Sequence, residues 1–229
     1  DLQDKLHFNI GRRRTLVAIG THDLDKIQGP FKYTALPYDD IKFVPLFEER
    51  EFNVSQLFNY YRNEKENSHL KPYIDIAADA QSARVAAGEP LLHPVILDAT
   101  GKVLSLPPVI NSEYSKLSLD TKNVFIEVTA TDFTKANIVL NTLIAMFSEH
   151  CAEKFSVEIV HVESPTDLPL PPNAEFAINK VAATPEALTI SYPNLDPRVF
   201  TTTAAYLNGG IGLNLSADEM VGLLNRMQL

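Results

Sequence analysis

Hydrophobic and polar residues alternate in the stretch FIEVTATDFT, which begins at Phe125, and its branched residues favour an extended chain. In a strand, Glu127 and Thr129 share one face with Phe125, while Ile126 and Val128 take the other. This alternation allows two interpretations of Glu127. Either the strand is half-buried with Glu127 in water, or Glu127 and Thr129 form the polar floor of a pocket.

Helical spacing of apolar residues, often behind a capping residue, predicts four helices. The segments lie within residues 2–10, 53–65, 132–151 and 215–229. Asn53 stands three residues before Gln56, and Ser216 stands three residues before Glu219, as in a capping box. The most strongly periodic segment follows Asp132 or the threonine before it, either of which can cap a helix.

Extended runs between glycines and prolines predict strands. The runs are TLVAIG, FKYTAL, IKFVPL, HPVIL, KVLSL, FIEVTATD, FSVEIVHVE and ALTISY. We expect a hairpin with Gly101 at its turn, and we expect Pro107 and Pro108 to end its second strand and leave a sheet edge. Residues 21–30 are predicted to form a polar loop or a single turn, and the alanine-rich residues 77–90 an exposed insertion. The proline-rich residues 164–173 are predicted to form a loop or linker.

The order of these elements indicates the fold class. Strands and helices are mixed without a regular strand–helix–strand alternation, which favours an α+β fold or a layered β-sandwich with helices outside. The 229 residues can bury a large core. No apolar run approaches the roughly 20 residues of a membrane-spanning helix. The chain opens DLQDKLHFNI, without an initiator methionine or a leader, so we expect a piece of a longer protein.

Charge and cysteine content narrow the function classes. The net charge of −9 argues against a protein that mainly grips phosphate backbones. The basic run Arg12–Arg14 is interpreted as solvated charge near a helix C-terminus, with a phosphate contact as the alternative. The single cysteine, Cys151, cannot form an internal disulfide and fits a reducing compartment. Its place in an apolar helical pattern predicts a core thiol.

The common catalytic motifs are missing from the sequence. The six histidines form no His-Glu-x-x-His pattern and no pairing with cysteines, so we expect no zinc site. The run GGIG at 209–212 lacks the context of a phosphate-binding loop, and there is no Gly-x-Ser-x-Gly elbow. A Ser-His-Asp triad whose members lie far apart in the sequence has no motif, so this alternative is kept. The candidate polar constellation is Ser105, Asn111, Glu127, Thr129 and His22.

Three blocks of the sequence carry a family resemblance. They are VAIGTHDLDKIQGPFKYTA, HPVILDATGKVLSLPPVIN and NVFIEVTATDFTKANIVLNTLIAMFSEHC. The chain resembles the β subunit of the eukaryotic and archaeal cytosolic phenylalanyl-tRNA synthetases. Residues 1–191 are similar to the B3/B4 editing domain of that family, and residues 192–229 to the start of the following B5 module. The insertion DAQSARVAAGE and residues 163–191 depart from the family pattern.

The resemblance implies a fold, a reaction and partners. The expected fold is a β-sandwich of unusual topology with flanking helices, and the expected partners are the α subunit, in an α2β2 heterotetramer, and the aminoacylated 3′ end of tRNA. The domain would hydrolyse tRNA wrongly loaded with tyrosine, in the cytoplasm and without a membrane. No cofactor and no metal are implied for this segment, because ATP and Mg²⁺ serve the complete enzyme.

The resemblance also assigns roles to the candidate residues. It places an editing pocket where the strand FIEVTATD meets the loop after VLSLPP. Glu127 falls at the position that recognises the tyrosine hydroxyl, and Asn111 and His22 are taken as further substrate-binding residues. The residues taken as catalytic are Ser105 and Thr129. The register near His22 is shifted by two residues relative to the family pattern.

Physical chemistry suits this assignment. Tyrosine differs from phenylalanine by one hydroxyl, and a buried acceptor left without a donor costs about 1–3 kcal/mol. An aminoacyl ester is activated, so a positioned water and a few donors can suffice for hydrolysis. A rival hypothesis is a non-catalytic β-subunit module that positions tRNA or the α subunit. A binding domain unrelated to translation is the third.

Overall fold

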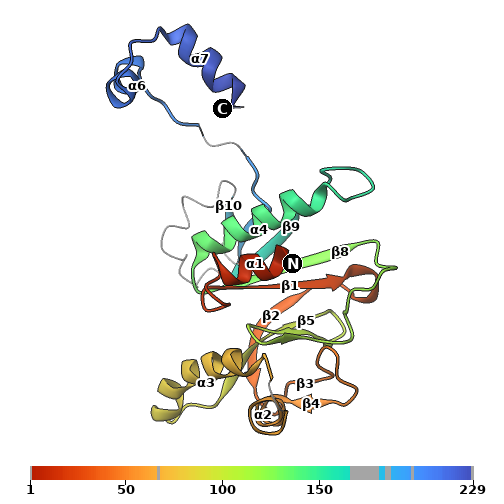
Figure 1. Cartoon of the computed structure of the whole chain (residues 1–229). Coiled ribbons are helices and arrows are strands. Elements are labelled where there is room, and N and C mark those ends of the chain that lie inside the picture. Colours follow the sequence, from red (N-terminus) through yellow and green to blue (C-terminus); the bar gives the residue numbers. More distant parts are fainter. Residues whose placement is uncertain (1, 66–67, 166–180, 184–186, 197–198, 228–229) are drawn as a thin grey trace. The chain divides into compact units, whose positions relative to one another are not determined.

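The chain forms two compact units, the first from Asp1 to Asn194 and the second from Leu195 to Leu229. This computed structural model describes residues 2–65, 68–165, 181–183, 187–196 and 199–227 (Figure 1). Within those ranges, no helix combines the length and the apolar character that crossing a membrane requires.

The first unit mixes helices with short strands. Its helical segments are α1 (Leu2–Phe8), η1 (Leu24–Lys26), α2 (Val54–Asn59), η2 (Tyr60–Glu64), α3 (Lys71–Ala86) and α4 (Phe133–Ser148). Its strands are β1 (Val17–Asp23), β2 (Lys32–Pro37), β3 (Lys42–Phe43), β4 (Phe52–Asn53), β5 (Leu92–Leu97), β6 (Val103–Leu106), β7 (Ile110–Asn111), β8 (Val124–Ala130), β9 (Val160–Pro165), β10 (Val181–Ala183) and β11 (Ala187–Tyr192).

All the strand pairs in the described part of the chain are antiparallel. Strand β1 pairs with β8, and a four-stranded sheet has the order β2-β5-β6-β7. Strands β3 and β4 form a short ladder, and β10, β11 and β9 form a three-stranded sheet in that order. This mixture of antiparallel sheets and helices confirms the predicted α+β class.

The β1–β8 ladder has two different faces. On one face, Val17 and Ile19 pack with Leu6 of α1 and with Val139 and Leu143 of α4. The strand residues Ile126 and Val128 of β8 lie against the same cluster, as the alternation predicts. Figure 1 shows α1 and α4 on this side of the ladder and β2 and β5 on the other. The second face therefore meets the four-stranded sheet.

A second and larger core lies beneath the four-stranded sheet. Val95 and Leu106 point into it from the sheet, and Leu57 of α2 and Ile74 of α3 fill it from the helices. All four are fully buried. Each such side chain contributes about 1.5–3 kcal/mol by leaving water, so this core holds the sheet against α2 and α3.

The predicted helix starts are confirmed by their capping contacts. Asn53 and Gln56 form a capping box at α2, and Asp132 accepts a hydrogen bond from the amide of Lys135 at α4. The second unit contains α6 (Ala204–Ile211) and α7 (Ala217–Arg226). Helix α7 opens with the predicted Ser216 capping box. Local side-chain chemistry therefore sets where these helices begin.

Three local expectations are wrong. Strand β1 continues to Asp23, so His22 and Asp23 are buried strand residues, and the predicted loop or single turn begins only with η1 at Leu24. The prolines after Leu106 do not leave an edge, because the chain turns back and β7 pairs with β6 beyond them. Helix α4 ends at Ser148, and Cys151 is exposed beyond it. The first results from pairing of β1 with the distant strand β8, the second from pairing of β6 with the nearby strand β7, and the third from the end of helix α4.

The last two local expectations concern the alanine-rich and proline-rich segments. Residues 77–86 continue helix α3, and most of residues 77–90 are exposed as expected. The helical conformation itself was not predicted, because the apolar pattern there is weak. The proline-rich loop or linker expected at 164–173 lies largely outside the described residues.

Candidate functional site

A small cavity lies where the β1–β8 ladder meets the four-stranded sheet. Its volume is about 20 Å³, room for about one water molecule. We call it the Glu127 cavity. It is lined by Arg14, Ala18, Ile19, Ser105, Leu106, Pro107, Pro108, Ile110, Asn111 and Glu127.

Glu127 reaches this cavity from the middle of β8. Its side chain is only 8% exposed, so the interpretation as a solvated strand residue is wrong. Oε1 accepts a 2.8 Å hydrogen bond from the hydroxyl of Ser105 on β6. Oε2 is buried and accepts no hydrogen bond from the described part of the chain. A buried carboxylate oxygen without a donor is a costly arrangement, so it marks a candidate ligand contact.

His22 lies behind Glu127 and does not line the cavity. Its ring is fully buried, Nδ1 lies 2.7 Å from the hydroxyl of Ser115, and Nε2 lies 3.8 Å from Oε1 of Glu127. This Ser-His-Glu line does not form a nucleophilic triad, because Ser115 is itself buried and does not line the cavity. His22 therefore lies against the carboxylate from the protein side, and its Nε2 makes no hydrogen bond with the described residues.

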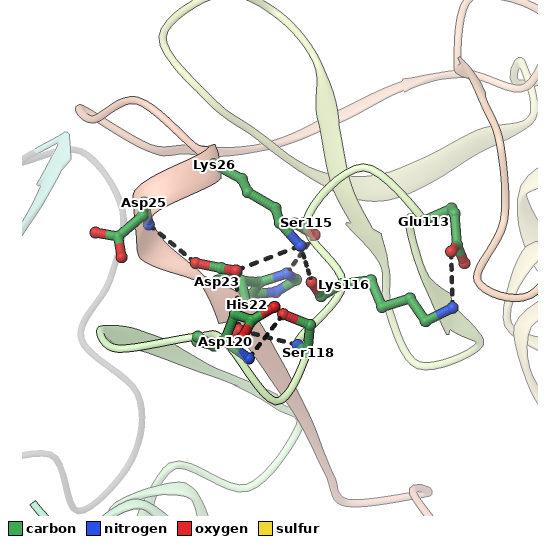
Figure 2. A network of polar contacts seen from close by, with 10 residues as sticks. His22, Asp23, Asp25, Lys26, Glu113, Ser115, Lys116, Ser118 and Asp120 are labelled. Carbon is green, nitrogen blue, oxygen red and sulfur yellow. Dashed lines mark hydrogen bonds and ion pairs between the residues drawn. The ribbon is translucent and has the colours of Figure 1, made fainter.

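The His22 region is held in place by a polar network. Figure 2 shows the end of β1 and η1 against the loop of residues 112–121. Asp23 accepts a 2.8 Å hydrogen bond from Thr121, and its carboxylate lies 3.3 Å from the ammonium group of Lys26. Lys26 also donates a 2.6 Å hydrogen bond to the carbonyl of Lys116, and this bond, with the Thr121 and Ser115 contacts, holds the loop against His22.

Asn111 and Thr129 occupy different positions relative to the cavity. Asn111 lines it, pairs with Ser105 across β6 and β7, and donates a long 3.4 Å hydrogen bond to the carbonyl of Thr21. Thr129 lies on the same face of β8 as Glu127, opposite the cavity residue Ala18, but it does not line the cavity. The structure thus brings Ser105, Asn111 and Glu127 together, and their assigned roles stay predictions.

Two residues of this site were not selected from the sequence. Gly20 lies directly opposite Glu127 in the β1–β8 register. A Cβ atom at position 20 would overlap Oε1 of Glu127 and would lie 2.9 Å from Nε2 of His22. A glycine inside a strand can mark a close approach of another group, and that was the only available signal.

The other missed residue is Arg14, which was interpreted as part of a solvated basic run. Its Nη1 donates hydrogen bonds of 3.4 Å and 3.1 Å to the carbonyls of Pro108 and Val109, and its guanidinium stacks on the ring of Tyr73 at 4.4 Å. Arg12, Arg13 and Arg14 all have positive φ, an unusual run for residues other than glycine. The turn directs Arg14 to the cavity wall.

The donor set in this part of the chain does not favour a metal. Among the described residues, no group of three or more His, Cys, Asp or Glu side chains could hold a metal ion. The polar atoms at the Glu127 cavity are one carboxylate, one hydroxyl, one amide and one guanidinium. Such a set can recognise a hydroxyl group and orient a water.

Comparison with known proteins gives the class of this domain. The family model described as the B3/4 domain matches residues 1–157, and the chain belongs to that family. Over its whole length it is similar to proteins named phenylalanine–tRNA ligase β subunit, with 44% identity to that of Dictyostelium discoideum and 42% to that of Saccharomyces cerevisiae. The resemblance to these β subunits is therefore confirmed. The chain spans about a third of their length, 32% and 33% respectively.

A solved structure supports the same fold. An N-terminal fragment of the phenylalanyl-tRNA synthetase β subunit from Pyrococcus horikoshii matches with a TM-score of 0.51 and 25% sequence identity. The match covers 87% of this chain and 60% of the other. The layered arrangement of antiparallel sheets and helices is thus shared with that fragment. The similar protein from Arabidopsis thaliana, 42% identical, carries the word cytoplasmic in its name.

Proposed function

We propose that this chain is the editing domain of a phenylalanine–tRNA ligase and hydrolyses tRNA(Phe) that carries tyrosine. The observation that carries the proposal is Oε2 of Glu127, a buried acceptor at the edge of a cavity to which no described residue donates a hydrogen bond. A tyrosine hydroxyl supplies that donor and a phenylalanine ring cannot. The difference is worth about 1–3 kcal/mol, or roughly ten- to a hundredfold in selectivity.

Each polar residue has a proposed part in the reaction. Glu127 accepts the tyrosine hydroxyl, while Ser105 fixes its carboxylate through the 2.8 Å hydrogen bond to Oε1. Asn111 offers an amide on the cavity wall for a polar group of the substrate. The hydrolytic water attacks the ester carbonyl and the ribose hydroxyl leaves. Thr129, on the same face of β8, is the proposed group that orients this water.

Admission of the tyrosyl group requires the cavity wall to move. A volume of about 20 Å³ is far smaller than a tyrosyl side chain. The wall includes Pro107 and Pro108, in the loop between β6 and β7. Its carbonyls accept hydrogen bonds from Arg14, so the proposed movement breaks these two bonds and shifts the loop away from Glu127.

The proposed partners follow from the family. The aminoacylated 3′ end of tRNA is the substrate, and an α subunit carries out aminoacylation with ATP and Mg²⁺, which the hydrolysis proposed for this chain does not need. The proposed location is the cytoplasm. The net charge of −9 fits a domain that receives only the 3′ end while other parts of the enzyme hold the tRNA body.

The small size of the cavity favours a second candidate function. A β-subunit module that positions tRNA or the α subunit, without hydrolysis, would need no opening at Glu127. The two functions differ in one measurable property. Only the editing domain releases tyrosine from tyrosyl-tRNA(Phe) at a rate that depends on Glu127.

The test compares three variants in the release of labelled tyrosine from tyrosyl-tRNA(Phe). Glu127→Ala should slow the release at least about tenfold. Glu127→Gln keeps a hydrogen-bonding group, so it should prefer tyrosyl-tRNA(Phe) over phenylalanyl-tRNA(Phe) more strongly than Glu127→Ala does. Thr131→Ala is the control, because this threonine lies beyond β8, donates a hydrogen bond to the Thr15 carbonyl and does not line the Glu127 cavity. Equal rates for the parent and all three variants would contradict the proposal.

A further inference from the structure

We propose that Gly20 is a positioning residue that lets the carboxylate of Glu127 cross strand β1 and reach Ser105. This inference rests on the proposed function for its effect on catalysis, but its structural part stands separately. Gly20 and Glu127 are direct partners in the antiparallel β1–β8 register, so their side-chain positions lie on the same face.

The Glu127 side chain occupies the space that a side chain at position 20 would fill. A Cβ atom there would overlap Oε1 and lie 2.8 Å from Cδ of Glu127. From this place Oε1 accepts the 2.8 Å hydrogen bond from Ser105 and approaches Nε2 of His22 to 3.8 Å. The absence of a side chain at position 20 is therefore a condition for the observed carboxylate geometry.

No backbone requirement explains the glycine. Gly20 is a regular strand residue and is not among the glycines with positive φ, which are Gly88, Gly101 and Gly212. Glycine in a strand interior stabilises the strand less than alanine does, because glycine loses more backbone conformational entropy on folding and has no side chain to pack. Space for the Glu127 carboxylate is the feature that favours glycine here.

The geometry also determines which carboxylate oxygen faces a ligand. Oε1 is held by Ser105 and lies near His22, which leaves Oε2 as the oxygen that accepts no hydrogen bond from the described residues. With alanine at position 20, the flexible end of Glu127 must move away from both partners. The strand pairing should survive this displacement, because the close atoms belong to the side chains of Glu127 and His22 and not to the backbone.

The experiment combines Gly20→Ala and Glu127→Ala, singly and together, in the full 229-residue chain. Gly20→Ala should slow tyrosine release from tyrosyl-tRNA(Phe) at least about tenfold and should add little in the presence of Glu127→Ala. The matched control is Gly222→Ala, where a Cβ atom would meet nothing within 4 Å. It should hydrolyse tyrosyl-tRNA(Phe) like the parent.

A second readout does not depend on activity. The ¹³C resonance of the Glu127 side-chain carboxyl, assigned by comparison with Glu127→Gln, should shift in Gly20→Ala and stay unchanged in Gly222→Ala. An unchanged resonance in Gly20→Ala, or rate losses that multiply in the double variant, would overturn the inference. If the parent chain releases no tyrosine, the proposed function fails, and the carboxyl resonance alone decides the role of Gly20.

Discussion

The hydroxyl of Ser105 on β6 donates a 2.8 Å hydrogen bond to Oε1 of Glu127 on β8. This contact joins the two sheets at the Glu127 cavity and uses the only hydroxyl proton of Ser105. Because the serine is almost fully buried and already engaged, it is better suited to hold the carboxylate than to act as a nucleophile.

Replacing Ser105 by alanine tests this role. Ser105→Ala leaves Oε1 buried without its donor and frees the carboxylate to rotate, so tyrosine release from tyrosyl-tRNA(Phe) should fall by about tenfold. The matched control is Ser118→Ala in the exposed part of the following loop, which should have no effect on release. A nucleophilic Ser105 would give a covalent tyrosyl adduct in rapid-quench experiments, and we expect none.

Replacing Arg14 by methionine should destabilise the first unit. The carbonyls of Pro108 and Val109 lose their guanidinium donor, and Tyr73 loses its stacking partner. We expect the free energy of unfolding, measured with urea, to fall by about 1–3 kcal/mol. Arg12→Met, at an exposed position in the same left-handed turn, is the control and should change it little.

Two buried histidines should make the fold sensitive to mild acid. Burial is the main cause that lowers the pKa of both His7 and His93 to about 4, and the charge of Arg14 adds to the effect at His7. Nε2 of His7 accepts a 2.9 Å hydrogen bond from the amide of Ile19, which requires the neutral ring. Below pH 6.5 the unfolded chain therefore binds protons that the folded chain does not.

The free energy of unfolding should accordingly be constant near pH 7 and fall from pH 6.5 towards pH 4. The slope should approach about 1.4 kcal/mol per pH unit for each histidine. His7→Gln keeps an acceptor for the Ile19 amide but does not titrate, so it should flatten the slope. The same change at the exposed His150 should leave the slope unaltered, and an equal slope in all three proteins would refute this account.

Binding of intact tRNA by the chain should depend only weakly on salt. The net charge of −9 leaves few clustered cations, and one of the three arginines in the basic run is directed to the cavity wall. Fluorescence titrations at several salt concentrations should give a log–log slope smaller than that of about six phosphate contacts. A steeper slope would show that this chain itself binds the phosphates of the tRNA body.

Patterns among residues close in sequence were sufficient to predict part of this structure. The two faces of β8 follow from the alternation around Glu127, and the starts of α2, α4 and α7 follow from capping residues that act within one helical turn. Such features depend on neighbours in sequence, so a sequence pattern can reveal them.

The remaining features depend on partners that are distant in sequence. Strand β1 extends to Asp23 because β8, more than a hundred residues later, pairs with it. Gly20 and Arg14 belong to the site through contacts with Glu127 and with the carbonyl of Val109, and neither contact has a local signature. The Glu127 cavity likewise forms only when four strands come together.

The two-faced ladder of β1 and β8 limits how this site can evolve. Inserting or deleting one residue in β8 would turn Ile126 or Val128 towards the cavity and Glu127 towards the helices, so the recognition group and the apolar core would be lost together. Selection should therefore remove insertions and deletions in this strand. Substrate preference can drift only by exchanging side chains one at a time, and position 20 restricts even those exchanges.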